Sequence, residues 1–278
     1  MNPPAATLEV AATVVLVRDG TNGPETLMLE RPSDRGSFAG AWVFPGGRVD
    51  PEDSAASEPD DSEHDTPEHD CADHDSPEHD PAEHDSEGRL PADVSPAGDE
   101  EPVAGGDEEQ SARRAAVREL HEETGLTVAV ADIHLISCWT PPLGIPRRFR
   151  TWFYLAKAPA GEITLSADEA VDHAWIRPID ALDAHSAGRL QLVAPTWVTL
   201  HLLAETDNLA GILSRAASTP EIHFRTRHSE QGNVLLWEPD VAYSDDGMLE
   251  ASGPRHRLEI TRLPWVYTRS VNAAQATG

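Results

Sequence analysis

The stretch Arg118-Glu119-Leu120-His121-Glu122-Glu123-Thr124-Gly125-Leu126 decides how this chain is interpreted. If it is helical, Glu119, Glu122 and Glu123 stand at positions i, i+3 and i+4 and share one face. Carboxylates packed this densely repel each other unless a cation lies between them, and hard oxygen ligands suit Mg²⁺ or Mn²⁺. The order of residues therefore favours a metal site over a solvated acidic surface.

The residues around the three glutamates support this interpretation. Arg118 lies four positions before Glu122, a spacing that allows an ion pair on a helix. Leu120 and Leu126 give the helix an apolar side, and Gly125 is well placed to end it in a left-handed conformation.

Composition limits the classes of protein to which the chain can belong. The 278 residues carry a net charge of −28, so a generic basic surface for nucleic acid is excluded. Two cysteines do not make a disulfide scaffold. There is no run of about 18 apolar residues for a membrane span, and Met1 to Leu8 has no pattern of a secretory signal. We therefore expect a cytoplasmic protein without a nucleic-acid or membrane partner.

Most of the net negative charge lies in residues 54–110. This segment holds 21 Asp or Glu and one basic residue, Arg89, for a net charge of −20. It repeats units such as Glu63-His64-Asp65, contains no aromatic residue and is rich in proline. Self-repulsion and the lack of apolar anchors predict a disordered insert. Its histidines leave open a metal-buffering role, although a five-residue period does not align them on one helical face.

A second glycine-rich stretch lies before the insert. It reads Gly40-Ala41-Trp42-Val43-Phe44-Pro45-Gly46-Gly47-Arg48. Excising 54–110 leaves Gly47, five residues, Asp53, seven residues and then Arg118-Glu119. Glu109 or Gln110 could replace Asp53 in this pattern. With that excision the two stretches resemble the Nudix box, with Asp53 where the family has Glu. An insert at this point resembles the branch of peroxisomal coenzyme A diphosphatases and their bacterial relatives.

The resemblance implies an α/β fold, a Nudix α/β/α sandwich with a mixed sheet. We expect a Nudix hydrolase domain over 8–185, interrupted by 54–110, and a C-terminal α+β extension over 186–278. Strands are expected at 11–17 and 26–29 as a hairpin, at 127–139, as an amphipathic strand at 148–156, and at 173–176, with the motif helix over 111–124.

The resemblance also implies roles for individual residues. The Gly46 carbonyl, Glu119, Glu122 and Glu123 would coordinate one to three Mg²⁺ or Mn²⁺ ions, and Arg118 would orient a ligand carboxylate. Glu169 is a candidate general base. Arg31, Arg147 and Arg148 are candidates for substrate binding.

The activity implied is hydrolysis of a diphosphate linkage in a nucleoside diphosphate derivative. Coenzyme A or acyl-coenzyme A is the first candidate, giving 3′,5′-ADP and (acyl-)4′-phosphopantetheine. ADP-ribose, NADH and diadenosine polyphosphates are alternatives within the class. A non-catalytic nucleotide-binding module and a metal-buffering protein are alternatives of another class. The sequence leaves the oligomeric state open, with a homodimer as one arrangement.

Overall fold

A long antiparallel hairpin forms the centre of the fold. The computed structural model describes residues 8–34, 38–54, 105–166 and 169–270. Strands β1 (Leu8–Gly20) and β2 (Gly23–Glu30) pair antiparallel around a tight turn. The β-branched side chains of β1 favour an extended backbone because they pack well on a pleated surface. The hairpin expected from the sequence is confirmed, with both strands longer than expected.

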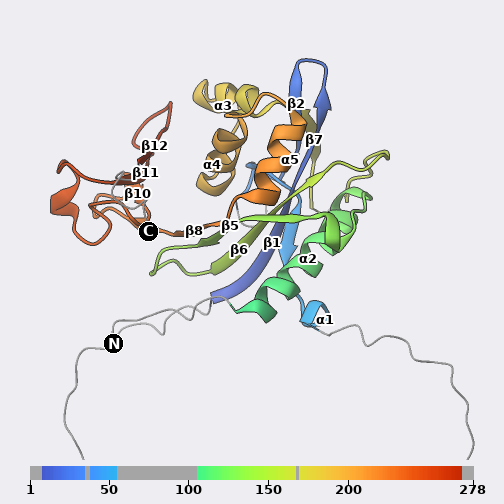
Figure 1. The fold of residues 1–278 in the computed structure, drawn as a ribbon, viewed down its shortest axis with the longest axis horizontal. Helices are drawn as coiled ribbons and strands as arrows, with labels where there is room; N and C mark the ends of the chain where they lie inside the picture. The colour runs from blue at the N-terminus through green and yellow to red at the C-terminus, as the bar shows by residue number, and fades with distance from the viewer. Residues whose placement is uncertain (1–7, 35–37, 55–104, 167–168, 271–278) are drawn as a thin grey trace, which may run out of the picture. The chain divides into compact units, whose positions relative to one another are not determined.

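Eight strands form the main sheet, in the order β3-β2-β1-β6-β5-β8, with β4 paired to β1 and β7 to β2 (Figure 1). The further strands are β3 (Trp42–Val43), β4 (Gly46–Arg48), β5 (His134–Thr140), β6 (Arg148–Lys157), β7 (Asp172–Ile176) and β8 (Ile222–Arg225). β1 runs parallel to β6, and β5 runs parallel to β8, while the other pairs are antiparallel. The sheet is therefore mixed, as expected.

Helix α2 (Gly106–Thr124) covers one face of this sheet, against β1, β4 and β6. Its inward side is fully buried and consists of the expected residues, Ala112, Ala115, Ala116 and Leu120. Gly125 ends the helix at a φ of 73° and donates its N–H to the His121 carbonyl. A left-handed residue at this position satisfies a carbonyl that the helix would otherwise leave open.

The helix begins five residues earlier than expected. Residues 106–110, which the sequence assigned to the insert, form the first turn of α2. Their acidic composition resembles that of the insert, but Asp107, Glu108 and Glu109 are favourable there because the N-terminal end of a helix carries partial positive charge. The His/Asp repeat of the insert lies outside the described residues.

Three helices cover the opposite face (Figure 1). They are α3 (Pro178–Ser186), α4 (Ala194–Leu203) and α5 (Leu209–Ser218), and a short helix α1 (Pro51–Ser54) lies beside α2. The core on this side includes Val15, Phe153, Leu155, Trp197 and Leu200, all buried. Helices on both faces produce the three-layered sandwich.

The strand β6 differs from the amphipathic strand expected at 148–156. Phe153 and Leu155 enter the core under α3, α4 and α5, but Trp152 and Tyr154 on the other side are buried too. The reason is α2, whose first turn accepts the Tyr154 hydroxyl at the Glu109 carbonyl, 2.9 Å away. A strand covered on both faces loses the alternation that the sequence suggested.

The first part of the chain after residue 186 belongs to the sandwich, and the last part forms a second sheet. α4 and α5 pack on the sheet, and β8 extends it through parallel pairing with β5. A second sheet follows, in the order β12-β11-β10-β9. It consists of β9 (Arg227–His228), β10 (Val234–Leu236), β11 (Arg255–Glu259) and β12 (Val266–Ser270).

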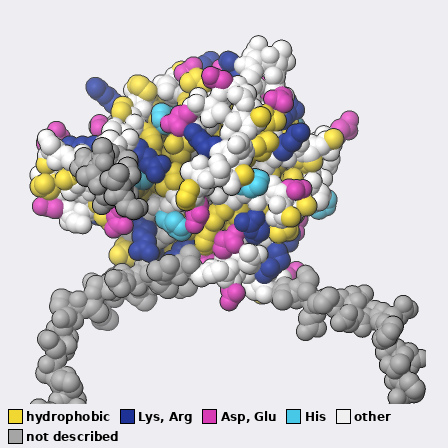
Figure 2. Space-filling view, viewed as in Figure 1, with side chains coloured by type: hydrophobic (Ala, Val, Ile, Leu, Met, Phe, Trp, Pro, Cys, Tyr) yellow, Lys and Arg dark blue, Asp and Glu magenta, His cyan; other side chains and the backbone are white. Residues whose placement is uncertain are grey.

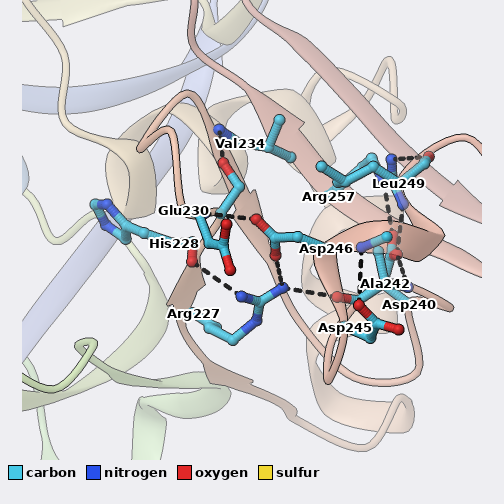
Figure 3. A network of polar contacts seen from close by, with 12 residues as sticks. Arg227, His228, Glu230, Val234, Asp240, Ala242, Asp245, Asp246, Leu249 and Arg257 are labelled. Atoms are coloured by element: carbon cyan, nitrogen blue, oxygen red, sulfur yellow. Dashed lines mark hydrogen bonds and ion pairs between the residues drawn. The ribbon is translucent and has the colours of Figure 1, made fainter.

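A network of polar contacts supports the second sheet (Figure 3). Arg257 binds both carboxylate oxygens of the buried Asp240, at 2.8 and 2.6 Å. Burial would raise the pKa of Asp240, but hydrogen bonds from Arg257 and from the N–H groups of His256 and Ala242 outweigh it and lower that pKa. Arg227 contacts Asp246 and the Ala242 carbonyl in the same network. None of the helices in the described ranges has the length and apolar character needed to cross a membrane.

Candidate functional site

The C-terminal half of α2 presents three carboxylates where the helix passes β4. Glu119 and Glu123 are buried, with 8% and 5% of their surface exposed, while Glu122 lies at the surface. Their spacing along the helix keeps all three near one face. Two of the three therefore lie in a site largely closed to water.

The glycines of β4 let its backbone approach these carboxylates closely. The Gly46 N–H donates a hydrogen bond to Glu123 Oε2 at 2.8 Å. A Cβ atom on Gly47 would lie 2.3 Å from the Glu119 carboxyl carbon, so any side chain there would displace the Glu119 carboxylate. Gly46 and Gly47 pair with Thr13 and Ala12 of β1, so the hairpin fixes their position. The structure thus brings the two stretches singled out in the sequence together.

Arg118 holds this arrangement from the solvent side. Its Nε and Nη2 atoms bind the Asp53 carboxylate, and its Nη1 atom binds Glu119 at 3.0 Å and Glu122 at 2.9 Å. The hydrogen bonds that Arg118 donates to Asp53, and the charges of Asp53 and Glu119, raise the pKa of Arg118 against the effect of burial. The fork of Arg118 is therefore occupied by Asp53, and the same side chain orients two of the helix carboxylates.

Of Asp53, Glu109 and Gln110, the three candidates for one position of the motif, Asp53 is the one that contacts Arg118. Glu109 binds Arg113 and Tyr154 instead, and Gln110 is exposed and binds Glu109. Sequence reasoning missed Arg114, whose Nε donates to the Asp53 carbonyl at 2.5 Å. Its position four residues before Arg118 on the same helical face was the available signal.

Glu169 reaches the same site from the segment after β6. Its Oε2 atom is buried and has no hydrogen-bond partner within the described residues. Its charge raises the pKa of both Glu119 and Glu123, so the three carboxylates lie close to each other. Hydrogen bonds from Ser166 N to Glu123 O, 3.1 Å, and from Val171 N to Glu30 O, 2.9 Å, hold this segment in place.

The buried carboxylates lack sufficient compensating charge. Burial raises the pKa of Glu119 against the opposing effect of Arg118. Burial also raises the pKa of Glu123, to about 8, although the Gly46 N–H and the charge of Arg31 lower it. Arg31 directly follows β2, and its charge acts on Glu123.

These residues fit a hard divalent cation. The site offers carboxylate oxygens as ligands, its carboxylates repel each other, and one buried oxygen of Glu169 has no partner among the described residues. A bound cation would compensate for all three features. Within the described residues no three His, Cys, Asp or Glu side chains are already gathered as a complete ligand set. Arg118 contacts Oε1 of Glu119 and Oε2 of Glu122, and each carboxylate has a second oxygen that can bind a cation.

Arg147 and Arg148 lie elsewhere. Arg148 is buried, and its guanidinium donates to the carbonyls of Pro141 and Pro142 at 3.0 and 3.2 Å, while Arg147 is exposed. Arg148 pairs with Leu8 of β1, whereas Gly46 pairs with Thr13. The separation of five positions along β1 corresponds to roughly 16 Å of strand. The structure therefore does not bring these two arginines to the carboxylates.

Comparison with known proteins places this geometry in a recognised domain. Residues 86–195 match the NUDIX domain. The match includes Arg118 to Gly125 and starts after Gly47, so the contact of α2 with β4 is what joins the first stretch to it. No curated protein matches the chain.

One solved structure has the same fold, and two others are less similar. A NUDIX hydrolase from Alicyclobacillus acidocaldarius is 21% identical, with a TM-score of 0.52 over 75% of this chain and 96% of that one. The NUDIX domain of Shewanella oneidensis NrtR, solved with ADP ribose, is 13% identical, with a TM-score of 0.42 over 72% of this chain and 88% of that one. A C. elegans Ap4A hydrolase is 18% identical, with a TM-score of 0.37 over 71% and 96%. The mixed sheet between α2 and α3 to α5 is thus a Nudix fold.

Proposed function

From the Nudix domain and the carboxylates that converge beside β4, we infer that this chain is a hydrolase acting on pyrophosphate bonds. We propose that it cleaves the diphosphate linkage of a nucleoside diphosphate derivative with the help of Mg²⁺ or Mn²⁺. The observation that carries this proposal is that Glu119, Glu123 and Glu169 raise each other's cost of ionisation, while a buried oxygen of Glu169 has no partner among the described residues.

Each residue of the site has a proposed task. Glu119, Glu122 and Glu123, with the Gly46 carbonyl, would hold the metal, and Arg118 would keep Glu119 and Glu122 in position. Bound divalent ions neutralise a diphosphate and lower the pKa of a coordinated water. Glu169 is the proposed general base because its free oxygen can accept a proton from the attacking water. Arg31 would bind a phosphate oxygen.

The proposed substrate is coenzyme A or acyl-coenzyme A. Water would attack one phosphorus in line, the anhydride P–O bond would break, and 3′,5′-ADP and 4′-phosphopantetheine would leave. The position of residues 54–110 inside the split motif, and the long chain after the Nudix match, support this choice. Arg147 remains a candidate for the 3′-phosphate because it is exposed, whereas the contacts of Arg148 favour a structural role.

A panel of substrates tests both levels of the proposal. Coenzyme A, an acyl-coenzyme A, ADP-ribose, NADH and diadenosine tetraphosphate would be incubated with Mg²⁺, Mn²⁺ or EDTA, and products identified by mass. We expect metal-dependent turnover, with the highest kcat/KM on coenzyme A or its thioester. Faster turnover of another compound would refute coenzyme A as the substrate but would still support hydrolase activity.

The alternatives of another class predict a different result from the same panel. A non-catalytic nucleotide-binding module would bind one of these compounds without releasing product. A metal-buffering protein would bind Zn²⁺ or Ni²⁺ through residues 54–110 and turn over none of them. The cytoplasmic location expected from the sequence remains part of our proposal.

A further inference from the structure

A cavity of about 200 Å³ lies on the face of the main sheet that α4 and α5 cover. Strands β5, β6 and β8 form its base, and α4 and α5 form its walls. Leu155, which lines it, points to the opposite side of β6 from Tyr154, whose hydroxyl contacts α2. The cavity is therefore separate from the carboxylate site, and a ligand could occupy it whether or not the proposed hydrolysis takes place.

The floor of the cavity is apolar and closed. Leu155, Leu203, Ile212 and Phe224 line it, and each has at most 4% of its surface exposed. One buried polar group, Ser137, also lines the cavity; its hydroxyl oxygen accepts a hydrogen bond from Trp139 Nε1 at 3.1 Å. Within the described chain this hydroxyl donates to no acceptor, so its proton is free to face a ligand.

The rim carries an excess of positive charge. Arg215 is paired with Glu205 at 3.0 Å and contacts the Leu202 carbonyl. Arg269, from strand β12, also lines the cavity. Across the described ranges, the Arg269 guanidinium has neither a hydrogen bond nor an ion pair, although the Arg269 backbone pairs with His256 of β11. Two arginines and one glutamate leave a net charge of +1 at the opening, in a chain whose total is −28. Figure 2 shows hydrophobic side chains among basic and acidic ones on the face that carries α4 and α5.

We propose that this cavity binds a small apolar carboxylate, with its chain on the floor and its head group at Arg269. A cavity of about 150 Å³ holds benzene, so this one has room for a chain of roughly six to eight carbons. An apolar pocket with one charged contact at its mouth fixes both the polarity and the orientation of the ligand. The ligand should carry a single negative charge because, among the described residues, Arg269 is the rim arginine without a carboxylate partner. Its chain should be narrow because the cavity holds about 200 Å³.

Calorimetric titration of the full chain with octanoate, octanol, octylammonium and acetate tests this proposal. We expect saturable binding of octanoate with a Kd of about 1 mM or tighter, weaker binding of octanol, and none of octylammonium or acetate. Arg269→Gln should weaken octanoate at least about fivefold and leave octanol unchanged. Arg262→Gln removes an exposed arginine outside the cavity and should change neither.

A second variant tests the floor. Ala216 is half-buried on α5 and lines the cavity, so Ala216→Leu should fill it and abolish binding of octanoate and octanol without lowering hydrolytic turnover. Equal affinity for octanoate and octylammonium would overturn the proposal, as would equal effects of Arg269→Gln and Arg262→Gln. If Ala216→Leu does not fold, the ligand series and the arginine pair still decide.

Discussion

Asp53 and Arg118 are separated by 65 positions, yet the Asp53 carboxylate accepts hydrogen bonds from Arg118 Nε at 3.2 Å and Nη2 at 2.9 Å. Asp53 is 5% exposed and also accepts the Asp50 N–H at 2.8 Å. The pair joins the part of the motif before the acidic segment to the part after it. It also positions the guanidinium that orients Glu119 and Glu122.

Asp53→Asn should weaken both the fold and the site. The amide cannot accept both guanidinium hydrogen bonds, so a partly buried charge loses its partner, at a cost of about 2 kcal/mol in the free energy of unfolding. Urea denaturation measures this loss, and turnover should fall with it. Asp50→Asn is the control, because Asp50 lies 3.6 Å from Arg118 and its side chain is about half exposed. Equal effects of the two variants would argue against a special role for Asp53.

Glu122→Gln should keep the fold and lower turnover by about 100-fold or more, because loss of a metal-binding carboxylate removes charge where the phosphates must be neutralised. Glu122 is half exposed, so little stability depends on it. The control is Glu52→Gln, an exposed glutamate on α1. Wild-type turnover in Glu122→Gln, with the fold intact by circular dichroism, would refute the proposed site.

Gly47→Ala should disturb catalysis more than folding. The added methyl group would meet the Glu119 carboxylate, the end of a flexible side chain that can move aside. We expect turnover to drop by about tenfold or more as the carboxylate leaves its position. Gly106→Ala is the matched control because no atom lies within 4 Å of its new Cβ. A Gly47→Ala enzyme as active as Gly106→Ala would show that the close contact is unimportant.

The stability of the metal-free protein should depend on pH through Glu123. Because burial raises its pKa from 4.5 to about 8, the folded state keeps a proton that the unfolded state releases. This contribution to stability is complete below pH 4.5 and is lost as the pH rises toward 8. Melting temperatures between about pH 5 and pH 8.5 should therefore fall less steeply in Glu123→Gln than in the wild type. Mg²⁺ should raise the wild-type value most at the alkaline end. Parallel curves for the two proteins would contradict this assignment.

The boundaries of the insert can be tested by deletion. Replacing residues 56–104 with a short Gly/Ser linker should preserve folding and turnover, since both halves of the motif and all of α2 remain. Deleting 54–110 should destabilise the protein by about 2 kcal/mol or more, because Glu108 then no longer binds Arg150 and Trp152. Thermal melts of both variants separate these outcomes. If the variant with residues 56–104 replaced by the linker failed to fold, this would count against the split motif.

Local sequence determined most of the elements and the chemistry of the candidate site. Residue type and spacing alone placed three carboxylates on one face of a helix, ended that helix at Gly125 and predicted the β1–β2 hairpin. These features follow from periodicity and backbone preference, which depend on residues close together in the chain.

Only the tertiary structure decided which charged residues meet. Acidic composition could not separate 106–110 from the segment before it, because the same residues favour a solvated chain and the first turn of a helix. Nor could it show that Asp53 meets Arg118, that Arg148 holds a loop, or that β8 extends the sheet. Apart from the contact of Arg148, these contacts join residues far apart in sequence, and the packing of α2 against one face and α3 to α5 against the other selects them.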